Sequence, residues 1–260
     1  YMSNFTFLTE EQCFGNDKLD ILEKRGIQAA ITDFSVLLGG CVLDNDGSLE
    51  GRTGWYWTKS DDGDNDAYLV NAHGSRYYHN VDERSGGARP ALPFSSIFSI
   101  PTNGESGKRG RDGILEVEYG YYPQKAVSKD MQARLEREYK SGRLSKTRNS
   151  YTTDSTRYTE YDTTFEPQTH QEYQYNGKRY VRVEANSYYD GNTFILSNGE
   201  QYRDGDNVWI EVSPVKWLVD EREKVMITDK LIFSGVQFNN KINNKKDYYH
   251  IIDFDKTDIK

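Results

Sequence analysis

A two-residue turn signal between two alternating runs is the feature that most constrains the fold of this chain. The segment 172–185, EYQYNGKRYVRVEA, places Asn176 and Gly177 between stretches in which polar and apolar residues alternate. Asn-Gly readily supplies the two positive φ angles of a tight hairpin turn, and the alternation gives each strand one buried and one solvated face. The segment therefore predicts an antiparallel hairpin.

The rest of the C-terminal half also has the character of strands. Asn-Gly at 198–199 and Asp-Gly at 204–205 predict two more turns. The apolar runs VWIEVSPVKWLVD and KVMITDKLIFSGVQF follow these turns and should form the core. Trp209 and Trp217 lie at alternating positions of the first run, which favours burial over contact with a ligand.

Between the two halves, the pattern changes from strand to helix and back. The segment 114–119 alternates as a strand does, and a turn near Pro123 is expected to end it. A helix is predicted over 128–140, because its apolar residues recur at a spacing of four. The span 146–168 is rich in Thr and Tyr with little core-forming content, which predicts an extended loop or an edge strand.

Three helical segments are expected in the first forty residues. Thr9 precedes two glutamates as a helix start would, and Asn16 is placed to cap a second helix that Gly26 ends. The segment 29–40, AAITDFSVLLGG, has apolar residues every three or four positions. This spacing predicts a helix buried on one face.

Composition indicates an ordered α+β chain with two parts. The 260 residues are enough for one large or two small domains, and the 20 tyrosines argue against disorder. The stretch 101–113 is rich in Gly, Ser and Lys and has no periodicity, so it is predicted to be a linker. We therefore expect a recognition part at 1–100 and a β-rich part at 114–260, either adjoining or completing one fold.

The segment 54–92 is predicted to form an ordered display surface. Trp55 and Trp57 supply apolar anchors, and glycines and a proline near its end fix the chain exit. The interior is too polar for a core, and surfaces rich in Tyr, Ser and Asn are typical of paratopes. The expected ligand-binding residues are Tyr56, Lys59, Asp62, Asp64, Asn65, Tyr68, Asn71, His73, Arg76, Tyr77, Tyr78, His79 and Asn80.

The acidic balance of the chain disfavours some classes of partner. The formal net charge is −8, so a phosphate backbone is a poor default partner, although aromatic residues beside Arg76 could stack on single-stranded bases. No apolar run is long enough to cross a bilayer and no leader is evident. We therefore expect a protein or glycan ligand, and a cytoplasmic or phage-particle-associated location.

No catalytic, metal or cofactor site is predicted. The acidic run 61–66 lacks the Gly and Glu positions of a calcium loop and is best explained as a solvated turn. Cys13 and Cys41 match no metal-ligand spacing and are expected to be buried, inert thiols. His73 and His79 have no recognisable nucleophile and acid partners, so they are interpreted as contact residues.

A set of ordered motifs carries a family resemblance. FTFLTEEQ, AAITDFSVLLGG, GWYWTKS with DAYLVNAHG, and GGARPAL resemble the "FLLS-E-E", "T-D-Y-A-x-x-x-G", "W-W-L-R-S" and "G-V-R-P-A-L" elements of a bacterial and phage family of unknown function. VEYGYYPQ, EVSPVKWLVD and VMITDKLIFSGVQF are similar to its "FGSYPQ", "P-I-E-W-L-V-L" and "A-L-L-I-S-K-Y-I-L" elements. That family is similar to the formylglycine-generating-enzyme branch of the C-type-lectin-like fold.

The motif order is reversed relative to that family. The elements that usually come last stand first here, so the chain is either circularly permuted or composed of the end of one copy and the start of another. The resemblance implies a C-type-lectin-like, formylglycine-generating-enzyme-type domain with added β-hairpins. It also implies a role like that of diversified receptor-binding proteins with this fold, in which a variable polar segment lies on a fixed frame.

The leading hypothesis is a non-catalytic binding protein that presents a Tyr-, Asn- and Asp-rich surface to a macromolecule. One alternative is a phage-encoded inhibitor that docks on a bacterial defence protein, which an acidic chain would suit if its target had a basic groove. The other is an enzyme of the formylglycine-generating type with a divergent site, which would need a reactive cysteine.

Overall fold

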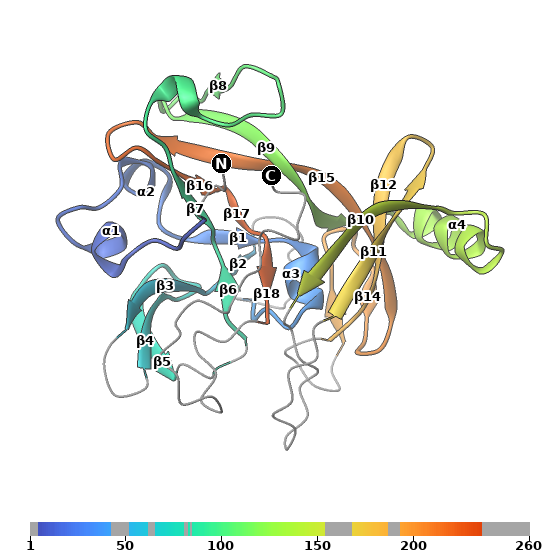
Figure 1. Ribbon diagram of the computed structural model, residues 1–260. Coiled ribbons are helices and arrows are strands. Elements are labelled where there is room, and N and C mark those ends of the chain that lie inside the picture. Colours follow the sequence, from blue (N-terminus) through green and yellow to red (C-terminus); the bar gives the residue numbers. More distant parts are fainter. Residues whose placement is uncertain are drawn as a thin grey trace.

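The protein is a mixed α+β molecule, built mostly from strands with few helices (Figure 1). The computed structural model describes residues 5–42, 52–61, 66–80, 83, 85–153, 168–186 and 193–235. The α+β prediction is confirmed at this level.

The largest sheet has eight strands and carries most of the C-terminal half. Its strands are β7 (Ala91–Pro93), β8 (Lys108–Arg109), β9 (Leu115–Ala126), β10 (Ser145–Thr153), β11 (Gln168–Tyr175), β12 (Lys178–Glu184), β15 (Asn207–Asp220) and β16 (Val225–Thr228). The order is β10-β11-β12-β15-β16-β7, and β9 pairs with both β15 and β8. All pairings in this sheet are antiparallel.

The predicted hairpin is present at β11 and β12. Tyr175 pairs with Lys178, and the two residues between them have positive φ angles, 50° at Asn176 and 77° at Gly177. The predicted turn near Pro123 is wrong, because β9 continues through that position. A register shift in the pairing of β9 with β15 falls beside Pro123, and such an irregularity lets a strand accommodate a residue that has no N–H.

The predicted helix over 128–140 is α4 (Lys129–Lys140), which lies against the β11–β12 end of the large sheet (Figure 1). Leu135 is its buried residue. The Gln132 side chain bonds both the backbone N–H and the C=O of Trp209, at 2.7 and 2.9 Å. Glu136 accepts a bond from the indole Nε1 of the same tryptophan at 3.1 Å and a bidentate pair from Arg182. These contacts fasten the helix to the sheet.

The N-terminal helices agree only in part with prediction. Thr9 caps α1 (Glu10–Phe14) in a reciprocal capping box with Gln12, as its position indicated. The second helix, α2 (Asp20–Arg25), begins after Leu19, so the expected cap at Asn16 is wrong. Gly26 follows α2 with a φ of 85°, which explains why the helix ends there.

The single helix predicted over 29–40 is wrong. The segment forms β1 (Ala29–Ile31) and then a short helix, α3 (Asp33–Leu37), with Thr32 as its N-cap. β1 pairs in parallel with β17 (Lys230–Leu231) and antiparallel with β2 (Thr53–Gly54). Pairing with a strand two hundred residues away overrides the local helical spacing.

A five-stranded sheet has the order β18-β6-β3-β4-β5. Its strands are β3 (Tyr56–Asp61), β4 (Asp66–Val70), β5 (Arg76–Asn80), β6 (Gly87–Ala88) and β18 (Phe233–Ser234). The remaining elements are the two-stranded β13 (Phe194–Ile195) and β14 (Gln201–Tyr202) and the 3-10 turn η1 (Ile97–Ser99). β5 is an edge strand of the five-stranded sheet, which places it at the periphery of the molecule (Figure 1).

The two parts expected at 1–100 and 114–260 share sheets and a core. β7 pairs with β16, and β6 pairs with β18. The largest buried cluster contains Phe34 and Trp57 from the first part together with Trp217 from the second. The core placement of Trp209 and Trp217 is confirmed. Within the expected linker, β8 pairs with β9.

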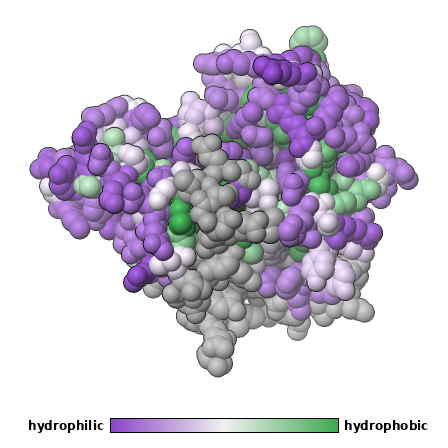
Figure 2. All heavy atoms as spheres, turned by 180° about the vertical axis from the view of Figure 1, so that it is seen from behind, coloured by the Kyte–Doolittle hydropathy of each residue, from purple (hydrophilic) through white to green (hydrophobic). Residues whose placement is uncertain are grey.

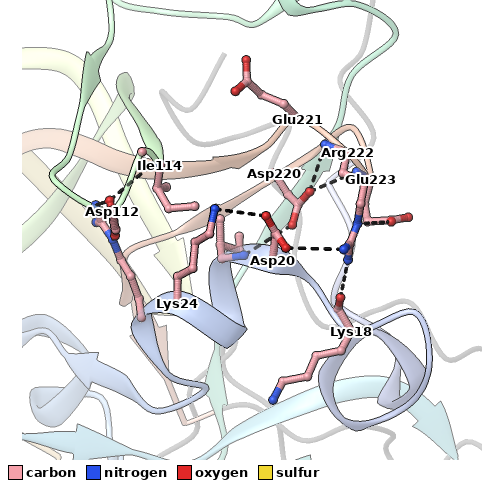
Figure 3. A network of polar contacts seen from close by, with 12 residues as sticks. Lys18, Asp20, Lys24, Asp112, Ile114, Asp220, Glu221, Arg222 and Glu223 are labelled. Atoms are coloured by element: carbon pink, nitrogen blue, oxygen red, sulfur yellow. Dashed lines mark hydrogen bonds and ion pairs between the residues drawn. The ribbon is translucent and has the colours of Figure 1, made fainter.

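A buried carboxylate joins α2 to the turn between β15 and β16 (Figure 3). Asp220 accepts backbone N–H bonds from Arg222 and Glu223 in the turn, at 3.1 and 3.0 Å, and from Ile21 in α2 at 3.4 Å. The Arg222 guanidinium continues the connection by donating to the Lys18 carbonyl at 2.6 Å. The helix is thus held to the sheet through backbone groups that the carboxylate satisfies.

Candidate functional site

The turn that precedes β5 is set by one asparagine. The Asn71 Oδ1 atom accepts bonds from the backbone N–H groups of His73 and Ser75, at 3.0 and 2.9 Å. The Asn71 N–H in turn donates to the Ser75 carbonyl at 2.9 Å, and Gly74 has a φ of 84°. The turn therefore continues the antiparallel pairing of β4 and β5 as far as Asn71 and Ser75. Asn71 was expected to contact a ligand, and its side-chain oxygen already accepts two hydrogen bonds within the turn.

Four consecutive side chains of β5, from Arg76 to His79, are exposed. Tyr77 and Tyr78 are 54% and 52% exposed, which is high for aromatic side chains. Their rings stack on each other, with centroids 5.5 Å apart and planes 12° apart. The structure thus places the two predicted tyrosine anchors side by side at the surface.

One face of β5 is organised around Tyr68 of β4. Tyr68 lies directly opposite Tyr78, so both point to the same face of the sheet. The Arg76 guanidinium lies over the Tyr68 ring, 4.3 Å from its centroid, and its Nε is 3.0 Å from Glu10 Oε1. Arg76 is therefore oriented by contacts on two sides. Glu10 of α1 was not predicted as part of this surface, and no local signal in the sequence indicates it.

The other face of β5 carries a stack of aromatic rings. His79 stacks on Trp55, with centroids 6.2 Å apart and planes 13° apart, and Trp55 meets Trp57 edge to face at 4.8 Å. The His79 Nε2 atom lies 3.9 Å from a Glu83 oxygen. Trp55 was predicted as a framework anchor, but it is only partly buried and supports an exposed side chain. We use "the β5 surface" for the side chains of Trp55, Tyr68, Arg76, Tyr77, Tyr78 and His79.

The prediction that Tyr56 contacts a ligand is wrong. Its side chain is 1% exposed, and β3 lies in the middle of the sheet, where Tyr56 pairs with the buried Val70. The hydroxyl donates to the Ile27 carbonyl at 2.8 Å and accepts a bond from Arg89 at 3.3 Å. Burial raises the pKa of Tyr56 to about 12. Tyr56 is a core residue that pairs with a buried arginine.

The remaining predicted contact residues are distributed around the hairpin. Lys59 on β3 and His73 in the turn are exposed. Asn80 ends β5, and its buried Oδ1 atom has no hydrogen-bond partner among the described residues. Asp62, Asp64 and Asn65 lie outside the described residues. The acidic run 61–66, which was considered as a calcium loop, falls largely in that same gap.

One buried carboxylate away from β5, that of Glu172, has structural partners. Glu172, fully buried in β11, accepts bonds from Tyr151 at 2.7 Å, Thr147 at 2.8 Å and Asn149 at 3.2 Å. Arg179 lies 3.6 Å from the same carboxylate. Because its oxygens are satisfied by neighbouring side chains, Glu172 is suited to fixing the sheet rather than to acid–base chemistry.

The cysteines do not form an evident reactive centre. Cys13 is a fully buried free thiol, and Cys41 is partly buried. Burial raises the pKa of Cys13 to about 12, which suppresses the thiolate that a nucleophile requires. The expected burial holds for Cys13 and only partly for Cys41. In the part of the chain that the structure describes, no three His, Cys, Asp or Glu residues are grouped as metal ligands.

Exposed large apolar side chains are few in the described part of the chain, which makes the β5 pair distinctive. The face seen in Figure 2 is mainly hydrophilic, with apolar atoms in small separate spots. Among the described residues, the exposed large hydrophobic side chains are Tyr77, Tyr78, Ile97, Phe98 and Tyr139. Of these five described residues, only Tyr77 and Tyr78 are stacked on each other within a surface that also carries a fixed arginine and a stacked histidine.

Comparisons with protein-family models, curated proteins and solved structures give no match to this chain. No helix in the described segments has the length and apolar content needed to span a membrane. The geometry of the β5 surface therefore carries the functional argument.

Proposed function

We propose that this protein is a non-catalytic binding protein that recognises a macromolecular ligand, a protein or a glycan, through the β5 surface. The observation that carries the proposal is the stacked pair Tyr77 and Tyr78, each more than half exposed on an edge strand. Tyr and Arg are enriched among the residues that dominate binding energy, because they offer a large contact area together with hydrogen bonds.

Preorganisation supports the same function. Arg76 is held between Tyr68 and Glu10, and His79 lies flat on Trp55. Side chains that already occupy fixed positions lose less conformational freedom when a ligand binds, so more of the contact energy appears as affinity. A surface whose side chains were only solvated would not need these supporting contacts.

The finer architecture belongs to the proposal as well. We propose a C-type-lectin-like frame of the formylglycine-generating-enzyme type, on which segment 54–92 forms the recognition region. The support is that β3, β4 and β5 fall within this segment and that β5 exposes its polar and aromatic residues. The motif resemblance adds the expectation that this region varies among related proteins.

The test is a binding screen with matched variants. Wild-type protein, the double variant Tyr77→Ala/Tyr78→Ala and the control Phe98→Ala are applied to the same glycan and peptide arrays. Phe98 is 97% exposed in η1, so its removal deletes an exposed aromatic outside the β5 surface. We expect Phe98→Ala to retain the array signals of the wild-type protein and the double variant to lose them. Signals that survive in the double variant but disappear in Phe98→Ala would contradict the proposal.

A further inference from the structure

We infer that the open edge of β5 receives an extended peptide segment of a protein partner, which adds a strand to the five-stranded sheet. The inference rests on the proposed function and narrows its ligand to a protein segment with an exposed, extended backbone. It follows from the hydrogen-bond register of the hairpin, the condition of the other sheet edges and the charges around β5.

The register determines which backbone groups of β5 face outward. The Asn71 N–H bonds the Ser75 carbonyl, so these two residues form a hydrogen-bonded pair at the turn. Bonded and non-bonded pairs alternate along an antiparallel ladder. Val70 and Arg76 are therefore a non-bonded pair, and the same holds two residues further on for Tyr78. Arg76, Tyr78 and Asn80 consequently direct their N–H and C=O groups away from β4.

Within the described segments, two of these three residues have outward backbone groups without a partner. The Asn80 N–H is bonded to His79 Nδ1 at 2.9 Å, and the Asn80 carbonyl accepts the Glu83 N–H at 2.9 Å. No described residue bonds the outward N–H and C=O groups of Arg76 and Tyr78. These groups repeat every second residue, which is a spacing of about 6.8 Å along a strand. An extended peptide presents complementary groups at that same repeat.

Several other described edge strands are interrupted or short. β10, at one edge of the large sheet, has a register shift between Lys146 and Ser150. β7 has three residues and β18 has two. Bulges and short length are the usual ways in which proteins block unwanted strand addition. β5 pairs with β4 over five consecutive residues without a shift, so its outer edge is straight and continuous.

The side chains around β5 indicate the character of the added segment. Tyr77 and Tyr78 would flank it, and cross-strand aromatic contacts favour aromatic or β-branched residues in the new strand. Three carboxylates, those of Glu10, Asp66 and Glu83, lie on or beside the hairpin, and Glu10 already pairs with Arg76. Charge complementarity therefore favours a segment that carries Lys or Arg and lacks Asp and Glu.

The experiment begins with a phage-displayed library of linear, unconstrained peptides selected on the wild-type protein. A synthetic version of an enriched peptide is then measured against Tyr78→Pro and Tyr78→Ala. Proline removes the outward N–H of residue 78 and leaves the β4–β5 bonds intact, because edge strands tolerate proline where the N–H faces solvent. Alanine removes the same side chain and keeps the N–H. Comparison of the two isolates the backbone contribution.

We expect the Kd for Tyr78→Pro to be about five to ten times that for Tyr78→Ala, because the proline variant loses one backbone hydrogen bond to the peptide. A second measurement needs no protein variant: single N-methylation along the peptide should weaken binding at alternate residues only. Hydrogen exchange at the Arg76 and Tyr78 amides should also slow when the peptide is added.

Three results would overturn the inference. The first is that the library yields no linear peptide that binds. The second is that the peptide binds the proline and alanine variants equally and that the N-methyl scan shows no alternation. The third is that the wild-type protein is a dimer, which Tyr78→Pro converts to a monomer. The last result would identify a second copy of this chain as the occupant. In each case the array screen still decides the proposed function separately, because it compares side-chain variants and includes glycans.

Discussion

The Arg76 guanidinium lies over the ring of Tyr68 on the neighbouring strand, 4.3 Å from the ring centroid. The two residues are diagonal neighbours across the β4–β5 ladder, because Tyr68 is directly opposite Tyr78. This contact orients the arginine beside the tyrosine pair. The geometry of the hairpin thus determines where the positive charge of Arg76 lies on the β5 surface.

Removal of that arginine should have little effect on stability. The Arg76 side chain is 49% exposed, and an exposed cation–π contact contributes about 0.5–1 kcal/mol. Its ion pair with Glu10 is screened by solvent and adds little. We expect Arg76→Ala to lower the free energy of unfolding in urea by less than about 1 kcal/mol. A loss above about 2 kcal/mol would assign Arg76 to the framework instead.

Asp220 should matter far more to the fold. Its carboxylate satisfies the backbone N–H groups of Ile21, Arg222 and Glu223 in a buried position (Figure 3). Asp220→Ala leaves these donors unpaired, which should lower the free energy of unfolding by about 2–4 kcal/mol. Asp220→Asn keeps one acceptor oxygen and should lose less.

The matched control for Asp220 is the adjacent Glu221. Glu221 pairs with Arg109 at the surface. Its replacement by alanine should change the free energy of unfolding by less than about 1 kcal/mol. Equal losses for Asp220→Ala and Glu221→Ala in denaturant titrations would contradict the role assigned to the buried carboxylate.

His170 should make the protein less stable as the pH falls from about 6.5. Burial lowers the pKa of His170 from its ordinary 6.5 to about 4, and no described residue bonds its Nε2 atom. Below pH 6.5 the unfolded chain binds a proton that the folded chain does not. Stability is therefore lost as the pH falls toward 4, at up to about 1.4 kcal/mol per pH unit.

The variant His170→Gln isolates this effect, because glutamine does not titrate. Glu136 contributes in a lower range, since hydrogen bonding from Arg182 lowers its pKa from 4.5 to about 2. Urea titrations between pH 6.5 and 4.5 should thus show a flatter dependence for His170→Gln than for wild type. Parallel curves would show that the imidazole is protonated in the folded protein.

Much of the local structure could be predicted because its signals are local. Asn176 and Gly177 specify their turn, and Thr9 specifies its cap by contacts within three residues. In these cases the residues that decide the conformation are neighbours in sequence.

The wrong or missing predictions concern residues whose conformation or burial depends on contacts with residues distant in the sequence. The segment 29–40 has a helical spacing, but pairing of β1 with β17 decides its conformation. Tyr56 resembles the other tyrosines of its segment, yet its position between β6 and β4 buries it. Trp55 belongs to the β5 surface through its contact with His79, and Glu10 supports that surface through its ion pair with Arg76. Such relationships are not encoded in any short stretch.

The two cysteines should differ in reactivity. Cys13 is fully buried with a pKa raised to about 12, whereas Cys41 is partly exposed. A thiol reagent applied to the folded protein should therefore modify Cys41 at most, and both cysteines after unfolding. Mass spectrometry of peptides reports the two sites separately. Rapid modification of Cys13 in the folded protein would revive the hypothesis of an enzyme with a reactive thiol.

The most direct test of the account is the effect of Tyr77→Ala on binding and on stability in the same preparation. The ligand is a peptide or glycan identified with the wild-type protein on the arrays. Because Tyr77 is 54% exposed, we predict a Kd at least tenfold higher, as for a dominant contact residue, with a melting temperature within about 2 °C of wild type. An unchanged Kd, or a fall in melting temperature that accounts for the lost binding, would contradict the claim that the β5 surface is the recognition site.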